Sequence, residues 1–143
     1  MSERQVPTDA IAVADRAGVT LSALCMLHCA AAPLAAISLP AFGATLAQHD
    51  WIHPLLAAVL SAIAVAAFVP GYRRHRDKRI PPLAALGLAL IIGAATGTGL
   101  SEGAEIALTL LGGGALVLAH LLNRSFCRRC RICSDAAARA GSP

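Results

Sequence analysis

Apolar residues run along this chain in four long blocks that contain no Lys, Arg, Asp or Glu. The blocks cover residues 17–48, 51–72, 80–101 and 106–123, and polar segments separate and flank them. A helix built from such a block is apolar on every face, whereas helices of soluble bundles carry a single apolar stripe. Because a bilayer core of ~30 Å requires ~20 helical residues, each block is long enough to span it. The pattern predicts four transmembrane helices rather than a soluble helical bundle.

The blocks define one transmembrane domain, residues 17–123, with polar segments on either side. Residues 1–16 are predicted to form a cytoplasmic N-terminal segment, and their mixed charge is not typical of a cleaved signal peptide. Residues 124–143 are predicted to form a cytoplasmic tail rich in Cys and Arg. The spans within the domain are expected at about 19–39, 53–72, 81–100 and 105–123.

Composition supports a membrane protein, and the distribution of charge predicts its orientation in the membrane. The chain is 57% hydrophobic and 14% charged, whereas a soluble domain is roughly 25% charged. All twelve Lys and Arg residues precede the first span, follow the second or follow the fourth. Since these segments share one side of a four-span protein, the positive-inside rule predicts cytoplasmic termini. Topology accounts for the positive charge, so we expect no nucleic-acid partner. The predicted fold class is an all-α membrane protein with four transmembrane helices and both termini cytoplasmic.

The first apolar block contains a cluster of side chains that can bind a metal ion. Cys25, His28 and Cys29 are the only ionisable residues between positions 17 and 48. Cys25 and Cys29 are four residues apart and share one helix face, with His28 beside that face. Thiolate and imidazole ligands suit soft or borderline metal ions. Cysteine also packs in helices as a small hydrophobic residue, but a cluster of three such residues favours a metal site.

Other donors lie near the ends of the predicted spans. His53 opens the second span, and His120 lies one turn before Asn123 near the end of the fourth. We take His53 and His120 as candidate metal ligands, and His120 would meet the Cys25 face if the first and fourth helices pack together. A solvated loop is the alternative interpretation for the donors on the predicted outer side, which are His49, Asp50, His53, Glu102 and Glu105. On the inner side, His75 lies in the basic loop and Asp15 at the entry of the first span.

The predicted tail carries a third group of candidate ligands. Cys127, Cys130 and Cys133 follow the spacing CxxCxxC and offer three thiols to one ion. Thiols in the cytoplasm stay reduced, so structural disulfides are not expected there. The spacing favours thiolate metal binding, and incidental cysteines next to the membrane are the alternative.

These motifs resemble the MerC family of mercury-resistance membrane proteins. The resemblance extends from about Asp15 to Cys133, and the segment LCxxHC of the first span is its most specific part. It implies a four-helix protein of the bacterial inner membrane that takes up Hg(II). It further implies that Cys25 and Cys29 receive the ion and that the tail cysteines pass it on. The residues that carry it are Asp15 to Gly18, Ser22 to Cys29, Pro33, His53, His75 and Ala119 to Asn123.

The leading hypothesis is a transporter that moves Hg(II) by thiolate ligand exchange from Cys25 and Cys29 to the tail. A transporter of Zn(II) or Cu(I) is an alternative, because His28 lies between the two thiols. A membrane sensor that binds a metal or haem and transports nothing is another, with His28 and His120 as axial ligands. A dithiol oxidoreductase is disfavoured, since an i,i+4 pair on a helix is poorly placed for a disulfide.

The hypothesis also defines what the protein should bind. We expect the lipid bilayer, the transported metal ion, a periplasmic metal donor and a cytoplasmic thiol acceptor as partners, and a homodimer is compatible with four short helices. The chain has no phosphate-binding GxxxxGK[ST] loop and no paired nucleophile and base. No catalytic activity and no resident cofactor other than the metal ion are therefore expected.

Overall fold

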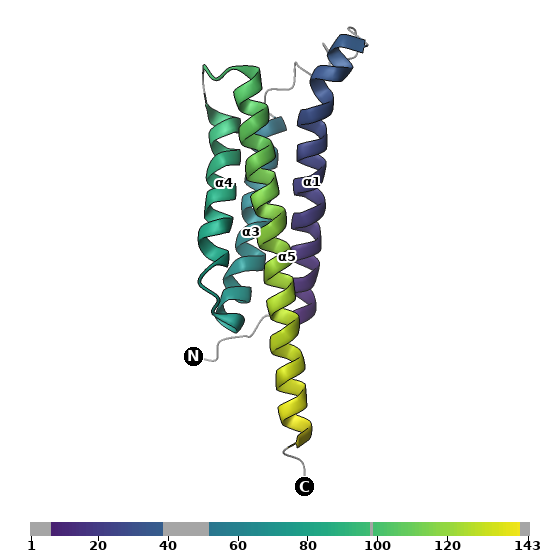
Figure 1. Ribbon diagram of the computed structural model, residues 1–143, viewed down its shortest axis with the longest axis vertical. Helices are drawn as coiled ribbons and strands as arrows, with labels where there is room; N and C mark the ends of the chain where they lie inside the picture. The colour runs from purple at the N-terminus through teal and green to yellow at the C-terminus, as the bar shows by residue number, and fades with distance from the viewer. Residues whose placement is uncertain (1–6, 39–51, 98, 141–143) are drawn as a thin grey trace.

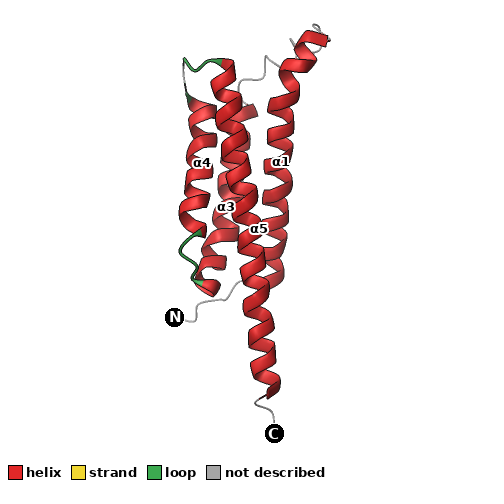
Figure 2. Cartoon of the chain, in the orientation of Figure 1, coloured by secondary structure: helices red, strands yellow, loops and turns green. Residues whose placement is uncertain are grey.

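Helices make up the structure of this chain. The computed structural model describes residues 7–38, 52–97 and 99–140, and side chains are described only as far as residue 130. Within these ranges there is no strand, as Figure 2 shows. The all-helical class predicted from the sequence is confirmed. The four helices are α1 (Thr8–Ser38), α3 (Ile52–His75), α4 (Ile80–Thr96) and α5 (Glu102–Ala140).

The helices form an upright bundle in which α3 and α5 each pack against all the other helices. Helices α1 and α4 do not touch in the described part of the chain. Helix α1 begins and α5 ends at the same end of the bundle, and the last turns of α5 project beyond it (Figure 1). Because α1 and α5 run in opposite directions, the first residues of α1 lie beside the late residues of α5.

Local sequence explains where the helices begin and end. In the turn before α4, the Asp77 carboxylate accepts a hydrogen bond of 2.8 Å from the Arg79 N–H. Prolines in the first turn of α4 cost little, because the N–H groups there have no helical partner. Gly97 ends α4, where its N–H donates to the Gly93 carbonyl at 2.8 Å. At the start of α5, the Ser101 hydroxyl accepts from the Ala104 N–H at 3.3 Å.

Small residues bring α4 and α5 into close contact. A Cβ atom added to Gly87 would lie 2.9 Å from the Gly112 carbonyl oxygen, and the reverse distance is 2.8 Å. Leu116 and Ile91 close the core on either side of this crossing. Close backbone approach at small residues is typical of helix pairs in membranes, where packing rather than the hydrophobic effect drives association.

The outer surface of the bundle is apolar. Leu27, Leu34, Ile37 and Leu111 are each more than 60% exposed, and many other large apolar side chains also face outward. Three helices, α1, α3 and α5, are long and apolar enough to cross a membrane. The fourth, α4, is apolar but has 17 residues, or about 25 Å of helix. The chain has the features of a multi-pass membrane protein.

The ends of the helices differ from the ends of the spans predicted from the sequence. Helix α1 starts at Thr8 and includes Asp15, which lies before the first apolar block. Helix α4 ends at Thr96 within the predicted span 81–100. Helix α5 continues without a break from Glu102 through the predicted tail to Ala140. Cys127 and Cys130 are therefore on the same helix as His120.

Candidate functional site

One face of α1 carries the candidate ligands into the bundle. Its buried residues recur every three or four positions, the spacing of a single helix face. Cys25 and Cys29 belong to this face and are 5% and 8% exposed. The other members are Ile11, Asp15, Gly18 and Ser22. The thiols thus point toward neighbouring helices rather than toward the surrounding lipid.

A thiol–imidazole group, formed by Cys25, His28, Cys29 and His53, lies where α1 meets the start of α3. The Cys29 Sγ atom is 3.7 Å from His53 Nε2. The His28 and His53 rings are 6.0 Å apart, centroid to centroid. Cys25 lies one turn earlier on α1, and its side chain interacts with that of Cys29. The structure therefore brings together four of the residues that the sequence singled out.

The Asp15 cluster, formed by Asp15, His75, His120 and Asn123, joins three helices toward the other end of the bundle. His120 Nδ1 lies 2.9 Å from Asp15 Oδ1. The Asn123 side-chain amide donates to both Asp15 oxygens, at 2.9 and 3.1 Å. Asn123 Oδ1 is 3.0 Å from His75 Nε2. Asp15 and His120 are each 1% exposed, so this is a buried polar network.

The hydrogen bonds show which groups of this network donate and which accept. The Asp77 backbone N–H donates to His75 Nδ1 at 2.9 Å, so the proton of this ring is assigned to Nε2. His75 Nε2–H then donates to Asn123 Oδ1, and Asn123 donates to Asp15. The Asp15 carboxylate also accepts from His120 Nδ1–H. A chain of hydrogen bonds thus leads from the turn before α4 to His120.

His120 ends this chain with an atom that has no partner. Its Nε2 and the Ser22 hydroxyl are buried without a hydrogen bond within the described ranges. The His120 ring stacks on Phe68 at 4.4 Å and lies directly against Gly18. A histidine that donates one ring N–H to a carboxylate and leaves the other nitrogen free has the arrangement of many metal-binding histidines.

Gly18 is required for this packing, and we expect Gly18→Ala to destabilise the protein by about 1–3 kcal/mol. The added methyl group would collide with the His120 imidazole, which Phe68 holds from the other side. Thermal unfolding in detergent would measure the loss. Gly114→Ala is the matched control, because a Cβ there meets nothing within 4 Å. Equal stability of the two variants would contradict the packing described.

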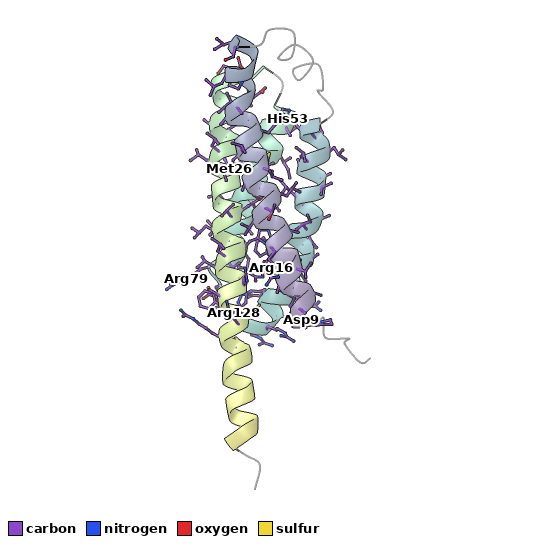
Figure 3. The ribbon with its side chains drawn as sticks, turned by 90° about the vertical axis from the view of Figure 1, so that its right-hand side faces the viewer. Asp9, Arg16, Met26, His53, Arg79 and Arg128 are labelled. Carbon is purple, nitrogen blue, oxygen red and sulfur yellow. The ribbon has the colours of Figure 1, made fainter. Side chains whose placement is uncertain are left out.

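The tail cysteines occupy different environments. Cys127 is 6% exposed and faces α1, whereas Cys130 is exposed on the projecting part of α5. The side chain of Cys133 lies outside the described residues. Figure 3 shows Arg128, next to Cys127, at the same end of the bundle as Asp9, Arg16 and Arg79, with His53 toward the opposite end. The structure therefore separates Cys127 from the thiol–imidazole group along the bundle.

Ligand number limits the metal sites that this conformation can form. In the described part of the chain, no three His, Cys, Asp or Glu side chains are arranged to hold one ion. The predicted outer donors His49 and Asp50 lie outside the described residues, and Glu102 and Glu105 are exposed at the start of α5. The thiol–imidazole group can offer two thiols, or one thiol and the His53 imidazole.

Sequence reasoning named every member of the Asp15 cluster but missed the cluster itself. It considered a meeting of His120 with the Cys25 face, and the first and last helices do pack together. His120 meets this face at Gly18, seven residues from Cys25 and roughly 10 Å along the helix. The spacing of Asp15, Gly18, Ser22 and Cys25 on one face of α1 was the available signal.

Comparison with known families adds one finding. The sequence model of a family described as MerC mercury resistance protein matches residues 15–125. The match begins at Asp15, spans the thiol–imidazole group and the Asp15 cluster, and ends before Cys127. No curated protein and no solved structure matches the chain.

Proposed function

Because the chain belongs to the MerC mercury resistance protein family, we propose that it carries Hg(II) through the inner membrane of a bacterium into the cytoplasm. It is a multi-pass membrane protein whose three longest helices can each cross a bilayer. The observation that carries the proposal is the thiol–imidazole group. Its two thiols are buried in an apolar bundle, where polar side chains are costly unless they serve a site, and Cys29 lies beside the exposed His53 imidazole.

The orientation we propose has four spans and both termini in the cytoplasm. Basic residues gather at the end of the bundle where α5 projects, as Arg16, Arg79 and Arg128 show in Figure 3. His53 lies toward the opposite end and would face the periplasm. The positive-inside rule favours this orientation. It places the thiol–imidazole group where an ion from outside would arrive first.

The proposed first step is capture of Hg(II) by Cys25 and Cys29. Thiolates are the preferred ligands of a soft ion, and Hg(II) binds two thiolates in a linear arrangement. His53 Nε2, 3.7 Å from Cys29 Sγ, is placed to join the ion during its arrival, and His28 lies beside it. A periplasmic donor protein or small molecule would supply the ion to the exposed His53.

Transfer toward the cytoplasm would follow the buried face of α1. His120 Nε2 is the free nitrogen between the thiol pair and Cys127, and the Asp15 carboxylate fixes its ring. Since this ring lies against Gly18, α1 and α5 must separate slightly for the ion to pass. The ion would then reach Cys127, Cys130 and Cys133 and a cytoplasmic thiol acceptor. Each step is an exchange of ligands, because a bare ion in an apolar interior is prohibitively costly.

Metal analysis of the purified protein tests this function directly. Wild-type protein exposed to Hg(II), Zn(II) and Cu(I) under reducing conditions should retain Hg(II) at the first-span site. The Cys25→Ser/Cys29→Ser variant should lose that ion while retaining mercury bound to the tail. Native mass spectrometry measures the stoichiometry, and Cys130→Ser is the control that leaves the thiol–imidazole group unchanged. Equal mercury content in the wild type and the double variant would refute the assignment.

The imidazoles make Zn(II) the second candidate cargo. Zn(II) is commonly bound by mixed sets of cysteine and histidine, and Cys29 lies close to His53 and His28. Retention of Zn(II) in preference to Hg(II) by the wild type, lost in a His53→Ala variant, would favour zinc transport. Binding of either ion without its transport into vesicles would favour a sensor.

A further inference from the structure

We propose that a cavity beside Cys127 admits a small thiol bearing a carboxylate, which takes the metal ion directly from Cys127. This inference rests on the proposed function and names the chemical class of the cytoplasmic acceptor. The cavity lies between the start of α1 and the part of α5 where it leaves the bundle, at the end marked by Asp9 and Arg128 in Figure 3. Its volume is about 60 Å³. The lining residues are Asp9, Ile11, Ala12, Asp15, Arg124, Cys127 and Arg128.

The small size of the cavity favours a small-molecule thiol over a protein as the acceptor of the ion. Cys127 is 6% exposed, so a folded domain cannot press a cysteine of its own against this thiol. Pockets that enclose drug-sized ligands measure roughly 300–1,000 Å³, far more than the space here. The cavity is suited to the narrow thiol-bearing arm of a small molecule whose remaining atoms stay outside. Cys130, exposed on the projecting helix, is the thiol that a protein acceptor could reach.

The thiol of Cys127 is available for exchange. It makes no hydrogen bond and no disulfide among the described residues, although it is more than nine-tenths buried. Of the two carboxylates that line the cavity, Asp15 accepts hydrogen bonds from His120 and Asn123, and Asp9 also has an interaction within the protein. The cavity therefore combines an unpartnered sulfur with carboxylates that already interact with other protein groups.

Two of the four charged residues that line the cavity, Arg124 and Arg128, can contact the carboxylate of an anionic thiol; the other two are Asp9 and Asp15. Arg124 and Arg128 lie one turn apart on α5, and neither forms an ion pair within the described part of the chain. A guanidinium group offers several N–H donors in a plane that matches a carboxylate. Arg129, the next residue, stands over the Phe126 ring at 5.9 Å and does not line the cavity. The two lining arginines are thus the candidate carboxylate contacts.

The exchange step balances without an oxidant or reductant. The incoming thiol loses its proton and its sulfur forms a bond to the metal ion held by Cys127. The bond between the metal ion and Cys127 Sγ then breaks, and Cys127 takes up a proton equivalent to the one released. The metal keeps its oxidation state throughout. An intermediate with both sulfurs bound avoids a bare ion.

The test uses the full-length protein in detergent with Cys127 as its single thiol. Cys25, Cys29, Cys130 and Cys133 are replaced by serine, and the protein is loaded with radioactive Hg(II). Transfer to 3-mercaptopropionate, which carries a carboxylate, is compared with transfer to the neutral 2-mercaptoethanol by counting the mercury left on the protein. We expect the anionic probe to react faster at equal thiolate concentration by roughly threefold to fivefold, the effect of a partly exposed charge pair.

Arginine variants assign the preference to the cavity. Arg128→Gln should remove most of the difference between the two probes, and Arg129→Gln should leave it intact. Equal rates for both probes in the parent protein would overturn the proposal, as would equal effects of the two arginine variants. Because this protein lacks Cys25 and Cys29, a negative result here leaves uptake through the thiol–imidazole group untouched. Loss of that uptake role would leave the probe preference at Cys127 unchanged.

Discussion

Cells that produce the Cys25→Ser variant should accumulate no more Hg(II) than cells that lack the protein. Cys25 is buried on α1 beside Cys29, and the two thiols are the pair we propose for first capture. Serine keeps the size of the side chain but replaces the soft sulfur ligand with a hard oxygen. Loss of even a group that supports a metal ligand costs roughly 10–100-fold in affinity. Loss of a ligand itself should therefore remove uptake altogether.

The measurement is uptake of radioactive Hg(II) by whole cells, with the amount of protein in the membrane checked for each variant. Ala30→Ser is the matched control, because it places the same hydroxyl group one residue after Cys29 on the exposed face of α1. It should accumulate mercury like the wild type. Wild-type uptake by Cys25→Ser, at equal protein levels, would exclude the thiol pair as the entry site.

The helices of this protein could be predicted from the sequence because its apolar blocks exceed the length of a bilayer span. Their ends could not, because helix formation does not stop where hydrophobicity does. Residues 124–140 include five Arg and lie outside the apolar blocks, yet α5 continues through them as a single helix. Residues 8–16 likewise extend α1. Hydropathy reports which solvent a segment prefers, and it does not report where backbone hydrogen bonding ends.

The thiol–imidazole group was predictable in part for a local reason. Cys25 and Cys29 are four residues apart, and a helix places such residues on one face whatever surrounds it. The contact of His53 with Cys29 depends on how α1 packs against α3, and no sequence spacing contains that information. The Asp15 cluster depends on three helix pairings at once, since Asp15, His75 and His120 come from α1, α3 and α5. The sequence therefore identifies the residues of the cluster, but it does not show that they contact one another.

Swapping Asp15 and Asn123 in one double variant should restore part of the stability that is lost when either residue is changed alone. In Asp15→Asn, the new amide N–H group has no acceptor if its oxygen keeps the bond to His120, and a buried unsatisfied group costs about 1–3 kcal/mol. In Asn123→Asp, two carboxylates face each other in a site that is 1% exposed or less. The double variant Asp15→Asn/Asn123→Asp again pairs one amide with one carboxylate, and it loses only the 3.3 Å bond from the Asn123 amide to the Ala67 carbonyl. Its carboxylate at position 123 can still accept from His75, and its amide oxygen at position 15 from His120.

Thermal unfolding of the four proteins in the same detergent measures this coupling. We expect the double variant to be more stable than the sum of the single effects by about 1–3 kcal/mol, within the range for residues in one hydrogen-bonded network. Glu105→Gln, at an exposed position on α5, is the control for loss of an acidic residue and should change stability much less. Strict additivity of the two single effects would show that Asp15 and Asn123 do not interact. A recovered double variant would show that the network needs one amide and one carboxylate at these positions, with either helix supplying the charge.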